Sequence, residues 1–401
     1  MDDQGDPGRG AWLVFRVFLR LGLTSFGGPV AHIGYFREEF VIRRRWLGER
    51  SFADLVALCQ FLPGPASSQF GMALGLVRAG YAGALAAWAG FTLPSAVALI
   101  LFAIGIARFG DAVPAGVLHG LKVVAVAVVA QAVWGMARNL STGAVKLAIT
   151  LAAAAVVSFV VSPWTQVGVI VAAGIAGVLL LEPPALALHE PLSTGVSRRA
   201  GAAWLALFLV LLAGLPLAAR LAPDPAIAMV DAFYRAGALV FGGGHVVLPL
   251  LQAEVVPRGW VDEQTFLAGY GAAQAVPGPL FTFAGFLGAS MHGAPSGWIG
   301  GAIALVAIFA PAFLLVAGAL PFWEALRHGA RMQAALAGVN AAVVGLLLAA
   351  LVHPVATSAI RDPGDVALAA VALVALMRWK LPPWLVVAAC GAAGWLLDRL
   401  V

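Results

Sequence analysis

Apolar stretches follow one another along the whole chain and are separated by short polar loops. A stretch of roughly twenty residues, wound as an α-helix, crosses the ~30 Å hydrocarbon core of a bilayer. The stretches lack the alternation that marks a β-barrel strand. The pattern therefore predicts an all-α polytopic membrane protein with segments at 11–36, 52–79, 81–107, 115–137, 144–161, 165–181, 201–220, 228–252, 264–291, 297–322, 332–352, 365–377 and 383–398.

The composition excludes a soluble protein. Of the 401 residues 62% are hydrophobic and 11% are charged, whereas a soluble domain carries roughly 25% charged residues. The net charge of +5 lies mostly in short loops beside apolar segments, where Lys and Arg orient helices, so no nucleic-acid partner is indicated. The two cysteines, Cys59 and Cys390, lie in apolar surroundings and indicate packing rather than a disulfide or a metal site.

One pattern of residues occurs in both halves of the chain. Six residues recur 215 positions later: Arg20, Gly22, Phe26, Gly27, Gly28 and Glu39 at Arg235, Gly237, Phe241, Gly242, Gly243 and Glu254. Seven more recur 214 positions later: Trp46, Phe52, Gln60, Pro63, Gly64, Pro65 and Gly71 at Trp260, Phe266, Gln274, Pro277, Gly278, Pro279 and Gly285. We therefore expect two homologous repeats.

The repeats divide the chain into a polar tail (1–10), a first transport repeat (11–181), a linker with a connecting helix (182–227) and a second transport repeat (228–401). Seven predicted segments precede the second repeat, and an odd number of crossings inverts it. The loop 37–50 is rich in arginine and predicted to be cytoplasmic, whereas its counterpart is acidic. Both observations favour inverted repeats.

The glycines of the repeat predict broken helices. Consecutive glycines interrupt a helix, and proline lacks the N–H that continues it. Unpaired backbone inside a membrane survives only against protein or a watery cavity, and each new helix N-terminus favours an anion. The alternative is that the glycines only allow close helix packing. The candidate substrate residues here are Phe26, Gly27, Gly28, Pro29, Phe241, Gly242, Gly243 and Gly244.

The two Pro-Gly-Pro motifs predict a second pair of breaks, because the residue before a proline is pushed out of the α region. Each break lies either between two half-helices or at the tip of a re-entrant hairpin, and a plain kink is the alternative. Hydroxyl side chains follow both motifs. The candidate substrate residues are Gln60, Pro63, Gly64, Pro65, Ser67, Gln274, Pro277, Gly278 and Pro279. Paired interrupted segments of this kind point to the binding site of a transporter.

Basic residues inside apolar segments are expensive, at roughly 3 kcal/mol or more. Arg20 and Arg235 each lie six residues before a Phe-Gly-Gly motif, and Lys122 lies deep in the segment 115–137. We predict that they neutralise a bound anion; snorkelling to the interface is the alternative, and it suits Arg16 well.

The candidates for proton coupling are His32, His245, Glu39 and Glu254, although a solvated loop charge is the other reading of both glutamates. His119 reads as a packing residue. The chain lacks the motifs of zinc proteases, serine hydrolases and P-loop nucleotidases, so neither an enzyme nor a cofactor nor a metal is predicted.

These motifs resemble the chromate ion transporter family, in its long type with two fused repeats. The resemblance is carried by Phe26-Gly27-Gly28-Pro29 with His32, by Trp46 and Gln60 before Pro63-Gly64-Pro65, and by the degenerate second copies, and it extends over roughly residues 12–395. The second copy has Gly244 in place of Pro29 and lacks the Arg43-Arg44-Arg45 cluster.

The resemblance implies a secondary transporter that exports chromate across the bacterial plasma membrane and confers resistance, with sulfate as a close mimic of the substrate. The alternatives are a carrier that takes up sulfate or another anion, and an intramembrane enzyme or scaffold without transport activity. The expected partners are the oxyanion and the bilayer, and a homodimer is compatible with the sequence.

Overall fold

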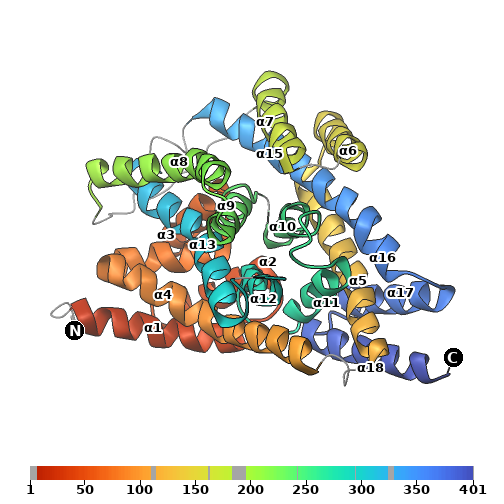
Figure 1. Ribbon diagram of the computed structural model, residues 1–401. Coiled ribbons are helices and arrows are strands. Elements are labelled where there is room, and N and C mark those ends of the chain that lie inside the picture. Colours follow the sequence, from red (N-terminus) through yellow and green to blue (C-terminus); the bar gives the residue numbers. More distant parts are fainter. Residues whose placement is uncertain are drawn as a thin grey trace.

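The computed structural model describes residues 7–109, 114–160, 163–182, 196–241, 243–293, 295–323 and 329–400, and these residues form helices and no strand (Figure 1). The predictions made for residues 1–6, for most of the linker (183–195) and for Gly242 lie outside the described residues. The all-α prediction is confirmed.

The first half begins with α1, which starts inside the predicted polar tail. Its helices are α1 (Pro7–Thr24), α2 (Gly28–Arg37), the π-helix η1 (Glu38–Arg43), α3 (Glu49–Phe61), α4 (Ala66–Phe109), α5 (Ala115–Leu140), α6 (Ala144–Phe159) and α7 (Pro163–Leu180).

The second half follows the connecting helix α8 (Arg198–Leu221). Its helices are α9 (Pro225–Ala238), η3 (Gly244–Val246), α10 (Val247–Val255), α11 (Glu263–Ala273), η4 (Leu280–Thr282), α12 (Phe283–Ser290), α13 (Gly297–Ala319), η5 (Leu320–Phe322), α15 (Ala330–Ala350), the π-helix η6 (Leu351–Ala356), α16 (Thr357–Ala359), α17 (Pro363–Met377) and α18 (Pro383–Leu400).

The long apolar helices fit a multi-pass membrane protein. Within the described residues, five helical stretches have the length and hydropathy of a membrane span: Ala66–Phe109, Ala115–Leu140, Arg198–Leu221, Gly297–Phe322 and Ala330–Ala359. The connecting helix α8 lies at the periphery (Figure 1), and 6% of its apolar stretch is buried inside the protein. Its side chains therefore face lipid.

The helix α4 turns back on itself where the sequence predicts the end of one segment and the start of the next. Ala79 and Gly80 leave helical geometry there, and Gly80 has a φ of 61°. The two arms touch through glycine, since a Cβ on Gly75 would lie 2.2 Å from the carbonyl oxygen of Gly83. The second half repeats the turn between α12 and α13, where a Cβ on Gly288 would lie 2.3 Å from the Gly300 carbonyl oxygen.

The two halves exchange their last helices. In the first half α5 packs against α17 and α18 of the second, and α15 of the second half packs against α6 and α7 of the first (Figure 1). Glycines make both contacts close: a Cβ on Gly120 would lie 2.1 Å from the Cys390 carbonyl oxygen, and one on Gly338 would lie 2.1 Å from that of Ala173. This reciprocity agrees with two repeats that pack against each other. The inverted orientation stays a prediction.

Candidate functional site

Both Phe-Gly-Gly motifs break a helix. In the first half α1 ends at Thr24 and α2 begins at Gly28, with Gly27 and Gly28 in the left-handed region at φ of 97° and 75°. In the second half α9 ends at Ala238, and the chain enters α10 through the short helix η3. The prediction of discontinuous helices is therefore confirmed. Glycine is needed because other residues pay a steric cost at positive φ.

Both Pro-Gly-Pro motifs break a helix as well. The first lies between the end of α3 and the start of α4, and the second lies between the end of α11 and the start of η4. Gly64 and Gly278 adopt φ of 126° and 100°, so the two loops have related conformations. Each loop separates two helices, which agrees with a break between half-helices and with the tip of a re-entrant hairpin, and both geometries stay predictions.

The four breaks are joined in pairs across the halves. The N–H of Gly64 donates to the carbonyl oxygen of Val240 over 2.7 Å, and the N–H of Gly278 donates to that of Ser25 over 2.9 Å. Ser25 and Val240 occupy the same position, just before the phenylalanine of each Phe-Gly-Gly motif. Each Pro-Gly-Pro loop is thus bonded to the Phe-Gly-Gly break of the other half, an exchange that the sequence did not predict.

Other contacts show that the breaks lie close together. A Cβ placed on Gly28 would lie 3.8 Å from Nε2 of His245, so the two Phe-Gly-Gly breaks are neighbours. In the described part of the chain the N-termini of α2, α4, η3 and η4 therefore meet in one region. A helix N-terminus carries unsatisfied N–H groups and partial positive charge, and those of α2, η3 and η4 have no side-chain cap.

Buried polar side chains without a hydrogen-bond partner gather around these breaks. They include atoms of Ser25, His32, Ser68, Thr92 and Gln274. The His32 ring packs edge-on against Phe91 at 5.2 Å and lies near the Ser25 backbone. Unpaired buried polar groups are rare in native structures. All five side chains can donate a hydrogen bond, so the region is equipped for an acceptor.

The remaining predicted residues at the breaks have mixed environments. Gly64, Pro65, Ser67, Gly244 and Pro279 are buried, Phe26, Gly28, Pro63, Phe241, Gly243, Gln274, Pro277 and Gly278 are half-buried, and Gly27 and Gln60 are exposed. Pro29 lies in the first turn of α2. Sequence reasoning missed Gln69, whose Nε2 donates to the Pro63 carbonyl oxygen over 2.7 Å and braces the first loop. Gln69 lies four residues after Pro65, one helical turn into α4, and this spacing could have indicated that its side chain reaches back to the loop.

The two equivalent arginines lie in different surroundings. Arg20 is exposed on α1. Arg235 is 7% exposed, and its guanidinium donates to both carboxylate oxygens of Asp231 over 2.8 Å and to Oε1 of Glu254 over 3.0 and 2.8 Å. The other oxygen of Glu254 accepts from Arg258 over 3.0 Å. Asp231, missed in the sequence, lies one helical turn before Arg235, which is the spacing of a helical ion pair.

The other ionisable candidates lie in several different surroundings. Glu39 is buried and accepts from Arg44 over 2.7 Å, in the loop rich in arginine. Lys122 is 3% exposed on α5, where no ion pair is found for it among the described residues. One turn earlier, His119 Nε2 lies 2.7 Å from Oδ1 of Asp365, which ties α5 to α17. His245 bonds to the Tyr270 hydroxyl over 2.8 Å.

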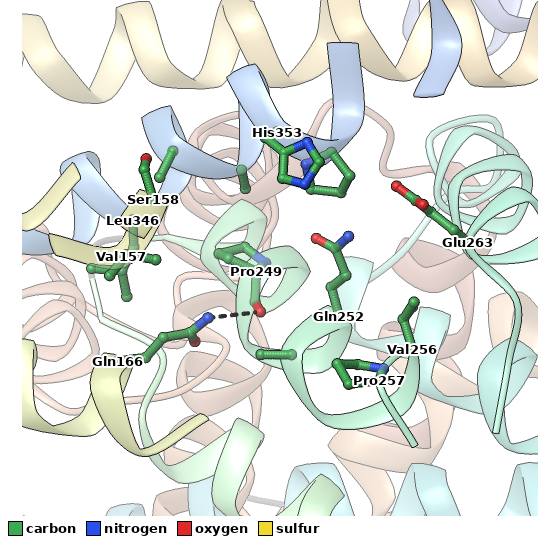
Figure 2. Close-up of a pocket in the computed structure, with 14 residues that line it drawn as sticks. Val157, Ser158, Gln166, Pro249, Gln252, Val256, Pro257, Glu263, Leu346 and His353 are labelled. Atoms are coloured by element: carbon green, nitrogen blue, oxygen red, sulfur yellow. Dashed lines mark hydrogen bonds between the residues drawn. The ribbon is translucent and has the colours of Figure 1, made fainter. Parts of the chain in front are cut away.

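A cavity of about 220 Å³ lies away from the breaks (Figure 2). It is enclosed by α6, α7, α10, α15 and η6, and Glu263 of α11 lies at its edge. A second, water-sized void of about 10 Å³ lies beside Arg235 and Glu254, and Gln166 lines both. No group of His, Cys, Asp and Glu suited to a metal ion is found in the described part of the chain.

The chain matches known transport proteins over nearly its full length. The chromate transporter family model matches residues 12–178 and 227–395. A chromate transport protein of Pseudomonas aeruginosa is 32% identical, over 96% of this chain and 92% of its own length. A probable chromate transport protein of Synechococcus elongatus is 27% identical over 94% and 93%, and a chromate transport protein of Cupriavidus metallidurans is 27% identical over 90% and 87%. No solved structure matches the chain.

The two matched regions coincide with the two repeats, and the named relatives are transport proteins rather than enzymes. Together with the long apolar helices, these matches confirm the family that Phe26-Gly27-Gly28-Pro29 and Pro63-Gly64-Pro65 indicated. The chain belongs to the chromate transporter family and is a multi-pass membrane transporter.

Proposed function

We propose that the protein exports chromate from the bacterial cytoplasm through the inner membrane and so confers chromate resistance. The observation that carries the proposal is the reciprocal pair of hydrogen bonds, Gly64 to Val240 and Gly278 to Ser25. These bonds hold four helix N-termini of the described chain around one region, where buried donors have no partner.

The chemistry of that region fits chromate. Fully ionised chromate is a tetrahedral dianion with acceptors and no donors, which suits N–H and O–H groups and arginine forks. Ser25, Ser68, Thr92 and Gln274 supply donors from four different segments. Positive potential at the helix N-termini adds to them. Arg20, Arg235 and Lys122 stay predicted contacts that neutralise the charge of the bound anion.

The membrane potential favours export. Moving a dianion out of a cell that is negative inside releases about 4.6 kcal/mol per 100 mV. The transporter therefore needs no ATP to keep chromate out. The loop 37–50, with Arg43, Arg44 and Arg45, is the predicted cytoplasmic entry side. The homodimer stays a prediction.

Chromate flux into inside-out membrane vesicles tests the proposal. With a potential set to mimic the cell, we expect the wild-type protein to accumulate chromate and sulfate to compete. Thr92→Val and Gln274→Leu each remove a buried donor that has no partner, so we expect a loss of about tenfold in kcat/KM while the protein still folds. Gln264→Leu is the matched control, because Gln264 is exposed and lies in the first turn of α11, the helix that ends just before Gln274.

Two outcomes would overturn the proposal. One is sulfate flux without chromate flux, which would make the protein a sulfate carrier. The other is chromate flux that Thr92→Val and Gln274→Leu leave at the level of Gln264→Leu, because the orphaned donors would then lie outside the route of the anion.

A further inference from the structure

The ion-pair network around Arg235 bridges the two half-helices of the second Phe-Gly-Gly break. Asp231 and Arg235 lie on α9 before the break, and Glu254 lies on α10 after it. The side chains of all three are less than a tenth exposed. Carboxylates accept from the Nε, Nη1 and Nη2 groups of Arg235, so an anion that binds this guanidinium competes with them.

Glu254 is the carboxylate that can leave. Asp231 holds Arg235 with both oxygens from the same helix, one turn away, so the two move together. Glu254 reaches Arg235 with the single oxygen Oε1 from the other side of the break. Any change in the angle between α9 and α10 therefore acts on the bond from Arg235 to Glu254 first.

A Glu254 that loses Arg235 has one buried oxygen, Oε1, without a hydrogen-bond donor. Its other oxygen keeps Arg258, whose side chain is 36% exposed. Burial, together with the loss of one of two guanidinium partners, favours the protonated form of a carboxylate. The anion and the carboxylate therefore exchange on Arg235, and the carboxylate is neutralised when they do.

Two cavities lie next to each other between the protein surface and Glu254. The outer cavity is lined by Gln252, Glu263 and His353, which face its interior in Figure 2, and His353 is exposed. Its inner end is Gln166, whose Nε2 donates to the Pro249 carbonyl oxygen over 3.1 Å and whose Oε1 has no partner. Behind Gln166 the void of about 10 Å³ borders Arg235 and Glu254 and has room for about one water molecule.

The charged groups that face Glu254 come from few elements. From α9 it faces Arg235 and, through it, Asp231; beyond α10 it faces Arg258. The helix α7 contains no titratable residue, and the single one of α15, Arg331, lies in its first turn. On η3, His245 is bonded to Tyr270.

We propose that Glu254 is the proton-binding residue of this transporter and that it takes up one proton, through the cavity closed by Gln166, when the anion binds at Arg235. This inference rests on the proposed function, because it needs the anion to reach Arg235. The proton comes from bulk water, bonds to a carboxylate oxygen of Glu254 and returns to water when Glu254 pairs with Arg235 again. By linkage, lower pH strengthens anion binding.

Proton uptake on chromate binding tests the inference. Purified protein is mixed with chromate in weakly buffered solution at alkaline pH, where chromate is fully ionised, with a pH dye as the reporter. We expect about one proton taken up per chromate bound, and an affinity that rises about tenfold per unit decrease in pH. Glu254→Gln should abolish both effects, and Glu254→Asp, which keeps the carboxylate, should retain them.

The route is tested separately. Gln166→Leu should slow proton uptake and leave the number of protons unchanged, while Glu263→Gln, at the mouth, should retain the full uptake. Chromate binding without proton uptake, or uptake that persists in Glu254→Gln, would overturn the inference alone. Absence of any chromate binding or flux by the wild-type protein would instead overturn the proposed function.

Discussion

The two halves share the same helix breaks and differ in the charged side chains around them. Four equivalent positions hold Arg16, Arg20, Glu39 and Arg43 in the first half and Asp231, Arg235, Glu254 and Arg258 in the second. The second set is balanced and closes into one network around a buried guanidinium. The first set carries excess positive charge, with Arg16 and Arg20 exposed on α1.

The two repeats share a backbone arrangement, but their equivalent positions have different roles. The breaks need glycine, proline and backbone bonds, which both halves keep. The charges are free to diverge around that frame. We infer that the first half attracts the anion by long-range electrostatics, and that the second half couples the position of its half-helices to an ion-pair network.

The largest contrast is expected between Arg235→Ala and Arg20→Ala. Removing Arg235 leaves Asp231 and Glu254 buried and unpaired, which should cost about 3–5 kcal/mol of folding free energy. Removing Arg20, which is exposed, should change it by no more than about 0.5 kcal/mol. Unfolding by SDS in mixed micelles measures both.

A triple variant sharpens that contrast. Arg235→Ala combined with Asp231→Asn and Glu254→Gln removes the unpaired charges, so it should recover part of the lost stability. Equal destabilisation by the two single arginine variants would show that the halves do not differ in this respect.

A smaller contrast is expected between the two Pro-Gly-Pro glycines. A Cβ on Gly278 would lie 2.9 Å from Ser95 Oγ and 3.1 Å from the Phe91 carbonyl oxygen, whereas one on Gly64 would meet mainly the side-chain amide of Gln69, at 2.8 Å. Since an amide end moves more easily than backbone, Gly278→Ala should destabilise more than Gly64→Ala, by about 1 kcal/mol beyond the shared cost of positive φ.

Gly259→Ala is the matched control for both substitutions. Gly259 has a φ of 67° and open space around its Cα, so its variant carries the conformational cost without a clash. The same SDS titration compares the three variants. A larger effect at Gly64 than at Gly278 would contradict the packing described for the two loops.

The smallest effect is expected from Arg16→Asp. This substitution places a carboxylate in the first half at the position that Asp231 occupies in the second. The introduced carboxylate would form an exposed helical pair with Arg20, one turn away, worth about 0.3–0.5 kcal/mol. The substitution would also remove excess positive charge from α1, so the KM for chromate should rise at low ionic strength. Flux measured at low and high salt checks this, and a KM that falls would contradict the role given to the first half.

Much of the fold could be predicted because its signals are local. Apolar length marks the spans, and the Pro-Gly-Pro motifs at Pro63 and Gly278 and the glycine at Gly80 mark places where helices end or turn. The exchange between the halves could not be predicted, since Gly64 bonds to a carbonyl oxygen of Val240, and every residue has such an oxygen. The sequence shows where backbone N–H groups lack a partner within their own helix. It does not show which other segment supplies the carbonyl oxygen that accepts from them.

The site was predicted unevenly for the same reason. The breaks were found through their glycines and prolines, but Ser25 and Thr92 lie in apolar segments whose sequence does not show which face meets the other half. Arg20 and Arg235 occupy equivalent positions, and alignment alone made them look equal. Asp231 carried the missing signal, one helical turn from Arg235.

The reciprocal bond between Gly64 and Val240 has a consequence for how the chain is made. Gly64 is synthesised well before Val240. Until Val240 has been added to the chain, the backbone N–H of Gly64 lacks the carbonyl oxygen that it bonds in the finished protein. The first membrane spans are therefore inserted before the two halves can pair. A chain that stops before Val240 would lack the hydrogen bond between the halves at the Gly64 loop.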